Sequence, residues 1–257
     1  MAVATFRFYE ELNDFLAPER RKVEFSYACA RRATVKNAIE ALGVPHTEVE
    51  LILVDGESVD FSHIVGEGER ISVYPVFEAF DVRPVLRLRP APLRRLRFIA
   101  DAHLGGLARF LRMLGFDTRY DNAFYDSEVR RIAAGEDRIV LTRDRALLKC
   151  ADVTHGCFVH ARKPEEQIRE IVQRLQLEHE ARPFTLCLTC NAPLEPVAKS
   201  AVVDRIPPKA AEFYERFSTC RVCNGIFWEG SHWKRMRMVL AGLGIEPEAG
   251  DAPAGTR

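Results

Sequence analysis

The chain has 257 residues, enough for two or three domains, and its apolar fraction of 47% is typical of a globular protein with a hydrophobic core. The formal net charge is zero, so total charge identifies no partner, although residues 93–175 contain 16 Lys and Arg against 12 Asp and Glu. No apolar run approaches the roughly 18 residues that a membrane span needs, and the amino terminus lacks a signal-peptide core. We therefore expect a cytoplasmic protein without a membrane segment.

Residues 1–80 have the pattern of a small α+β domain. Apolar residues at helical spacing occupy 34–42, with Thr34 suited to the N-cap and Gly43 to the end of the helix. An Asp55-Gly56 turn separates the last two expected strands. The order β-β-α-β-β resembles the β-grasp fold of ubiquitin and of small sulfur-carrier proteins. The expected strands cover residues 3–9, 21–27, 49–54 and 70–76.

Residues 81–92 contain three prolines and four charged residues, which favours an extended linker because proline disfavours helix in the residue before it. From residue 93 to 180, strand and helix patterns alternate, which predicts a parallel sheet with helices on both faces. Strands are expected at 96–100, 116–120, 139–142 and 156–160. Helices are expected at 104–114, 127–134, 145–149 and from Pro164 to Leu175.

Acidic residues follow two strands of this expected sheet. Asp101 comes directly after the first strand, and Asp144 follows the third. Asp126 is a natural N-cap for the helix expected at 127–134, with Glu128 just inside that helix. Ligands of open α/β sheets bind at the carboxyl ends of the strands, and clustered carboxylates are suitable ligands for Mg²⁺ or Mn²⁺. The alternative is structural, because Asp is also common after strands and at helix N-caps. The pattern alone leaves both interpretations open.

Three segments resemble the Mut-seven C-terminal RNase family, a branch of the PIN-like nucleases, over roughly residues 95–240. They are Phe98-Ile99-Ala100-Asp101-Ala102-His103-Leu104-Gly105-Gly106-Leu107-Ala108-Arg109 with its continuation to Asp117, Asp126-Ser127-Glu128-Val129, and Ile139-Val140-Leu141-Thr142-Arg143-Asp144-Arg145. The resemblance implies a PIN-like nuclease fold at 93–180 and a metal-dependent ribonuclease that hydrolyses RNA phosphodiester bonds.

The same resemblance implies that Asp101, Asp126 and Asp144 hold Mg²⁺ or Mn²⁺. The family's usual Asp-Glu-Glu-Leu run is replaced here by Asp126-Ser127-Glu128-Val129, so Glu128 is the alternative to Asp126 as third ligand. We expect Arg109, Arg143 and Arg145, which flank the acids in sequence, to bind RNA phosphates. Arg112, by contrast, is expected to be a solvated helix position.

Two Cys-x-x-Cys pairs, Cys187/Cys190 and Cys220/Cys223, indicate a zinc ribbon at residues 181–240. Four thiolates close the tetrahedral shell of the zinc ion and leave no open position, so the zinc is expected to be structural. Asparagine follows each pair and tolerates the left-handed backbone that such turns need. The other cysteines, Cys29, Cys150 and Cys157, look like small apolar residues. Residues 241–257 are expected to be disordered.

A ubiquitin-like domain of this type resembles those fused to the same RNase family. We expect it to fold alone and to have a binding or regulatory role, for which a protein partner is one candidate. Sulfur transfer is not expected, because residues 74–80 lack the required Gly-Gly end. The rival hypothesis is a non-catalytic RNA-binding or adaptor protein whose acids are structural and whose zinc ribbon and ubiquitin-like domain bind partners.

Overall fold

The computed structural model describes residues 1–75 and 96–245, so the expected linker 81–92 and most of the expected tail 241–257 lie outside the described residues. The described chain forms two compact units. The first combines residues 1–75 with residues 130–158, and the second combines residues 96–129 with residues 159–245. Each unit is described by itself below.

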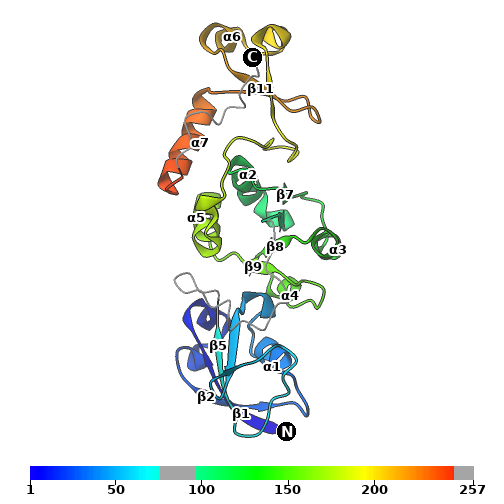
Figure 1. The fold of residues 1–257 in the computed structure, drawn as a ribbon, viewed down its shortest axis with the longest axis vertical. Helices are drawn as coiled ribbons and strands as arrows, with labels where there is room; N and C mark the ends of the chain where they lie inside the picture. The colour runs from blue at the N-terminus through cyan, green and yellow to red at the C-terminus, as the bar shows by residue number, and fades with distance from the viewer. Residues whose placement is uncertain (76–95, 246–257) are drawn as a thin grey trace. The chain divides into compact units, whose positions relative to one another are not determined.

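A five-stranded sheet forms the larger part of the first unit (Figure 1). Its strand order is β2-β1-β5-β3-β4, in which β1 runs parallel to β5 and the other neighbours are antiparallel. The strands are β1 (Ala2–Phe8), β2 (Phe25–Cys29), β3 (Leu51–Val54), β4 (Glu57–Ser58) and β5 (Arg70–Tyr74). The short β4 was not predicted, and β2 begins four residues later than the expected strand 21–27.

The hairpin between β3 and β4 depends on the expected Asp55-Gly56 turn. Both residues have positive φ, +49° for Asp55 and +90° for Gly56, as a two-residue type I′ turn requires. The turn pairs Val54 with Glu57, which adds β4 to the edge of the sheet.

Helix α1 (Val35–Ala41) packs against this sheet and has the predicted ends. The hydroxyl of Thr34 accepts from the backbone N–H of Asn37, and the Asn37 side chain accepts from the backbone of Thr34, which makes a capping box. Gly43 ends the helix at φ +111°, where an added Cβ would lie 2.8 Å from the carbonyl oxygen of Phe15. The helix and sheet enclose a core that includes Phe6, Phe8, Ile39, Ile52 and Ile71.

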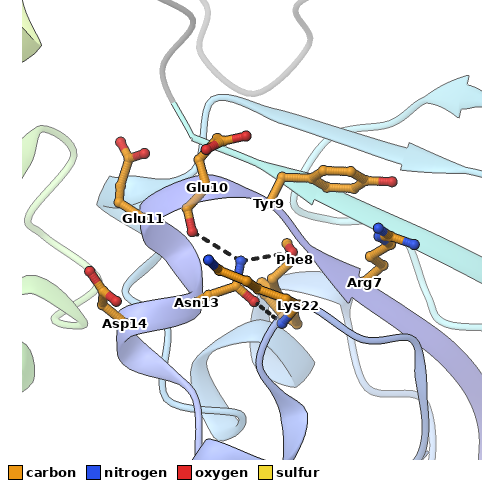
Figure 2. A pocket seen from close by; sticks show the side chains of 8 residues that line it. All are labelled: Arg7, Phe8, Tyr9, Glu10, Glu11, Asn13, Asp14 and Lys22. Atoms are coloured by element: carbon orange, nitrogen blue, oxygen red, sulfur yellow. Dashed lines mark hydrogen bonds between the residues drawn. The ribbon is translucent and has the colours of Figure 1, made fainter.

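Two short 3₁₀ helices, which the sequence did not predict, complete this domain: η1 (Glu10–Phe15) and η3 (His46–Glu48). A shallow pocket of about 470 Å³ lies beside η1 (Figure 2). It is lined by Arg7, Phe8, Tyr9, Glu10, Glu11, Asn13, Asp14 and Lys22. A further 3₁₀ turn, η2 (Pro18–Arg20), leads into β2.

The remaining part of the first unit alternates strand and helix as predicted. Strand β8 (Ile139–Thr142) is buried throughout and pairs in parallel with β9 (Gly156–Phe158). The single-turn helix α4 (Arg145–Leu148) lies between them in the chain, and α3 (Asp126–Glu136) precedes β8.

The second unit begins with a parallel pair, β6 (Phe98–Ala100) and β7 (Thr118–Arg119), joined by the turn η5 (Ala102–Leu104) and helix α2 (Gly105–Met113). Helix α5 (Pro164–Leu175) packs against α2. Pro164 occupies the first position of α5, as predicted, and Ile168, Ile171 and Val172 face inward. The turn η6 (Leu177–His179) follows.

A three-stranded antiparallel sheet forms the carboxyl-terminal part of the second unit, in the order β10 (Glu195–Val197), β11 (Phe217–Thr219) and β12 (Ile226–Trp228). Helix α7 (Ser231–Gly242) ends this part, and Ile245 is buried beyond it. The first residues of the expected tail 241–257 are therefore helical and packed, because Leu240 and Ile245 have an apolar surface to bury. Two 3₁₀ turns, η7 (Lys199–Ala201) and η8 (Val203–Arg205), and helix α6 (Pro208–Phe213) connect β10 to β11.

The fold class predicted from the sequence is confirmed: a β-grasp domain, parallel strands with helices, and a four-cysteine module. None of the helices in the two described ranges has the length and apolar character needed to cross a membrane.

Candidate metal centres

Asp101 stands at the carboxyl end of β6, where the sequence predicted a metal ligand. It is partly buried and occupies the N-cap position of η5, and its carbonyl oxygen accepts from the N–H of Leu104 at 2.8 Å. Its carboxylate does not cap the turn.

Asp144 follows β8 and caps α4. Its Oδ1 accepts from the N–H of Ala146 at 2.7 Å, and its own N–H donates to Thr142 Oγ1 at 2.9 Å. The structural role that we weighed as the alternative is thus present at Asp144. Capping occupies Oδ1 and leaves the carboxylate exposed, so capping and metal binding by Asp144 are compatible.

The expectation that Asp126 caps the helix after it is wrong in detail. Helix α3 begins at Asp126 itself, so Tyr125 takes the capping position. Glu128 reaches back from the third helical position, where Oε2 lies 3.4 Å from the N–H of Tyr125. Asp126 is exposed. The backward contact gives Glu128 a role in the first turn of α3.

The three arginines expected to bind RNA phosphates have different surroundings. Arg109 and Arg143 are exposed, Arg109 on α2 and Arg143 directly before Asp144. Arg145 is also exposed at the start of α4, and its guanidinium group contacts Phe15 and Phe158. Phosphate binding by these three arginines stays a prediction.

Arg112 was expected to be solvated, and this is wrong. Its side chain is only 4% exposed. Nε donates to the carbonyl oxygen of Thr118 at 2.9 Å, and Nη1 donates to those of Leu188 and Thr189 at 3.1 and 2.8 Å. Burial lowers the pKa of Arg112, while the nearby thiols Cys187 and Cys190 act in the opposite direction. Helical periodicity alone could not have identified the contacts with Leu188 and Thr189, because these residues lie more than 70 positions later in the chain.

Four cysteines form a compact cluster at residues 187–223. Their sulfur atoms all lie within 4.8 Å of one another, with Cys187 and Cys223 separated by 3.6 Å and Cys190 and Cys220 by 3.3 Å. A disulfide would need about 2.05 Å, whereas a tetrahedral zinc with bonds of about 2.3 Å places its sulfur ligands roughly 3.8 Å apart. The cluster therefore fits a metal of the size of zinc. Across the two described ranges, no other three or more His, Cys, Asp or Glu side chains gather this closely.

The thiols of the cluster differ in their pKa values. Burial raises the pKa of Cys190 to about 12. Burial also raises the pKa of Cys220, but hydrogen bonds from the backbone of Cys223, the Cys190 thiol and the backbone of Val222 outweigh it and lower the pKa to about 7. A divalent cation binds cysteines as thiolates, so metal binding would release the protons of all four thiols.

Backbone turns present the cysteines as the sequence predicted. Asn191 and Asn224, which follow the two pairs, have φ values of +66° and +56°. The N–H of Cys187 donates to Ala192, and that of Cys220 donates to Gly225, at 2.8 and 3.0 Å. Asn191 has a second function that was not predicted, because Oδ1 accepts from the N–H of Thr118 at 2.9 Å. It thus joins the cysteine cluster to β7.

Comparison with known proteins identifies two families along the chain. A sequence profile described as Mut7-C RNAse domain matches residues 96–240, more than half of the chain. The chain belongs to the Mut7-C RNase family. A second profile, described as Mut7-C ubiquitin, matches residues 1–81. The resemblance inferred from the sequence, including the fused ubiquitin-like domain, is confirmed.

No curated protein matched the chain. Two solved structures of the small archaeal modifier protein SAMP1 from Haloferax volcanii did match. They are 17% and 15% identical, cover 29% and 31% of this chain and 98% and 100% of their own, and give TM-scores of 0.24 and 0.25. Such low TM-scores carry no argument about function.

Within the Mut7-C domain, the aromatic residues after the second cysteine pair are packed instead of exposed. Trp228 lies beside Phe217, with ring centroids 6.4 Å apart, and belongs to a small core with Val202 and Ile206. Trp233 contacts Phe184, and the Arg237 guanidinium lies over its ring.

Proposed function

We propose that this Mut7-C protein is a metal-dependent ribonuclease in which Asp101, Asp126 and Asp144 are the ligands of Mg²⁺ or Mn²⁺. The observation that carries the proposal is the Mut7-C RNAse profile, whose match contains all three aspartates. Two of them stand just beyond β6 and β8, strands that each have a parallel neighbour. The carboxyl end of parallel strands is where such folds bind ligands.

Carboxylate oxygens are hard ligands, and three of them satisfy much of the demand of a Mg²⁺ or Mn²⁺ ion for oxygen. The bound ion would lower the pKa of a water molecule and neutralise charge on the phosphate. The task of the chain is to hold the ion and the RNA backbone. Arg109 and Arg143, both exposed, are proposed to contact phosphates.

The four cysteines are proposed to hold a structural zinc ion. Their shell is complete without water, so the site has no position at which a substrate oxygen could bind. The β-grasp domain is proposed to act in protein contacts, and residues 130–158 of the same chain are its observed neighbour. Residence in the cytoplasm belongs to the same proposal.

Cleavage of labelled RNA tests the ribonuclease assignment. Purified protein is incubated with single-stranded RNA, hairpin RNA and DNA of the same sequence, each with Mn²⁺, with Mg²⁺ and with EDTA. We expect RNA cleavage that requires metal. End-labelled products report whether cleavage is internal or terminal. If the wild type and Asp101→Asn give the same products at the same rate, the activity belongs to a contaminant or to another site.

The rival assignment is a non-catalytic adaptor that binds RNA through the cysteine module. RNA binding without cleavage under every metal condition would support that assignment. Filter binding with the same labelled RNA measures this directly.

A further inference from the structure

Arg145, directly after Asp144, holds the nuclease segment 130–158 against the β-grasp domain within the first compact unit. Its Nη1 and Nη2 donate to the carbonyl oxygens of Phe15 and Asp14 at 3.3 and 3.2 Å. The guanidinium carbon lies 4.8 Å from the centre of the Phe15 ring and 5.5 Å from that of Phe158. One cation therefore contacts two aromatic rings and two carbonyl groups, and three of these four groups belong to the β-grasp domain.

The carbonyl groups that accept hydrogen bonds from Arg145 are at the end of η1. The side chain of Asn13 fixes the conformation of η1 (Figure 2). Asn13 is 4% exposed, and its Nδ2 donates to the carbonyl oxygens of Phe8 and Glu10 at 3.0 and 2.9 Å. Its Oδ1 accepts from the N–H of Lys22 at 2.6 Å. Because its position is fixed from both sides, η1 offers a preformed acceptor, and a cation is favoured at the carbonyl end of a helical turn.

A second set of contacts joins η3 to the segment around β9. Glu48 is 2% exposed, and its Oε1 accepts from the N–H of Phe158 at 2.5 Å. His46 is 6% exposed and donates from Nε2 to the carbonyl oxygen of Val153 at 3.0 Å, while Nδ1 faces Glu40 at 2.7 Å. Burying polar groups is costly unless each finds a partner, and here Glu48 and the Nε2 atom of His46 find theirs in the segment 130–158.

The third contact attaches the end of α4. Lys149, directly after the helix, donates from Nζ to the carbonyl oxygen of Glu40 at 2.8 Å. The Phe15 and Phe158 rings meet edge to face, with centroids 5.4 Å apart. Both ends of α4 are therefore attached to the β-grasp domain, through Arg145 at its first residue and Lys149 just beyond its last.

This attachment bears directly on Asp144. Helix α4 has four residues, too few to be stable alone, so its neighbours determine its position. Its first turn is defined by the contact between Asp144 Oδ1 and the N–H of Ala146. Any shift of Arg145 displaces the adjoining cap and with it the Asp144 carboxylate.

We propose that the β-grasp domain is a positioning module for the nuclease. Arg145 is the positioning residue through which the β-grasp domain fixes the place of the Asp144 carboxylate. The inference rests on the proposed function of Asp144 as a metal ligand. It replaces phosphate binding as the role of Arg145, because the guanidinium group is already engaged by η1 and two aromatic rings. The ubiquitin-like domain then positions a segment of its own chain, and this role requires no external partner.

The test uses the full-length protein and three variants: Arg145→Ala, Arg145→Lys and Phe15→Leu. Arg145→Lys keeps the charge and one donor, so it should restore part of the effect. Phe15→Leu weakens the same contact from the β-grasp side, 130 positions from Arg145 in the sequence. Arg31→Ala, at an exposed arginine of the β-grasp domain, is the matched control. Circular dichroism and melting curves verify that each variant is folded.

Three quantities are measured for each protein: kcat, KM for RNA, and the Mn²⁺ concentration at half-maximal rate. We expect Arg145→Ala and Phe15→Leu to raise that Mn²⁺ concentration and to lower kcat by about 10-fold or more, as loss of an outer support of a metal ligand does. KM for RNA should stay within about twofold. A phosphate contact at Arg145 would instead raise KM, weaken its salt dependence, and leave Phe15→Leu unchanged, which would overturn the proposal.

Hydrogen exchange at α4 separates failure of this inference from failure of the proposed function. Amide protection at Ala146–Leu148 should fall in both Arg145→Ala and Phe15→Leu and stay unchanged in Arg31→Ala. An inactive wild type would refute the ribonuclease assignment, while loss of α4 protection would still establish the hold of the β-grasp domain on this helix. An active wild type with unchanged kinetics and unchanged protection in the variants would refute the positioning role itself.

Discussion

Arg112 on α2 donates a hydrogen bond to the carbonyl oxygen of Thr189, inside the first Cys-x-x-Cys turn, at 2.8 Å. The nuclease helix and the cysteine module are thus joined by a buried cation. Four thiolates around a divalent zinc ion carry a net charge of −2, so a cation beside them is favourable. The contact is structural and electrostatic at once.

Replacing Arg112 by methionine should destabilise the protein by about 2–3 kcal/mol, because three carbonyl oxygens lose their donor. Methionine retains most of the packing of the aliphatic stem. Urea unfolding monitored by fluorescence measures the change. Arg109→Met, on the same helix but exposed, is the control and should cost less than about 0.5 kcal/mol. An equal loss of unfolding free energy in the two variants would contradict the role assigned to Arg112.

The protein should bind one zinc ion per chain at Cys187, Cys190, Cys220 and Cys223. Elemental analysis of protein purified without chelator measures the stoichiometry. Cys220→Ser should lose the zinc and unfold the module around 187–228, since metal binding supplies folding energy in such small structures. Cys150→Ser, at a partly buried cysteine outside the cluster, should keep full zinc content. Wild-type protein that contains no zinc would refute the assignment of the four cysteines as a zinc site.

Asp144→Asn should abolish cleavage without loosening α4. Asparagine is as good an N-cap as aspartate, so the bond to the N–H of Ala146 is retained while the charge is lost. We expect a rate loss of at least about 100-fold for this variant and for Asp101→Asn, comparable to removing a preorganised electrostatic group. Mn²⁺ should raise the melting temperature of the wild type more than that of either variant.

Glu128→Gln is the control for the third ligand. Because Glu128 contacts the N–H of Tyr125, its replacement should change stability slightly and leave most of the activity, whereas Asp126→Asn should remove it. The reverse result in the cleavage assay would identify Glu128 as the ligand.

Stability in acid should depend on Glu170 of α5. Burial alone would raise its pKa, but hydrogen bonds from the His160 side chain and from the N–H groups of His160 and Ala161 outweigh this and lower it. A carboxyl group with a lowered folded-state pKa adds stability above its unfolded pKa, near 4.3, and loses it as pH falls through the folded value. Melting curves from pH 7 to pH 3 should therefore show less acid sensitivity for Glu170→Gln than for the wild type, from a lower starting stability.

Glu165→Gln is the comparison for that measurement, since Glu165 is exposed on the same helix. Its melting temperature should follow the wild type at every pH. A parallel pH dependence of the wild type and Glu170→Gln would show that other groups determine acid sensitivity.

Local patterns predicted the elements that depend on neighbouring residues. Helix α1 with its Thr34 cap, the helix beginning at Pro164, strand β8 and the left-handed turn residue Asn191 all follow from short-range chemistry. The cysteine cluster was equally accessible, because metal geometry restricts the spacing of its ligands.

Long-range contacts of polar residues could not be predicted in this way. Arg112, Arg145 and Glu48 look like ordinary surface residues in sequence, yet each finds its partner more than 70 positions away. Only the fold brings those partners together. The N-cap of α3 was misplaced for a different reason, since Asp126 and Tyr125 are adjacent and a shift of one residue exchanges their roles.

Asn191 also limits how the chain can be recombined. Its backbone completes a cysteine turn while its amide oxygen accepts from Thr118 and its amide nitrogen donates to Asp117 at 2.5 Å. A chimera that carries a foreign zinc ribbon would bind its metal and still leave β7 without these bonds. A successful graft would have to supply its own hydrogen-bond partner for the edge of β7, so the cysteine module cannot be exchanged independently of the strand beside it.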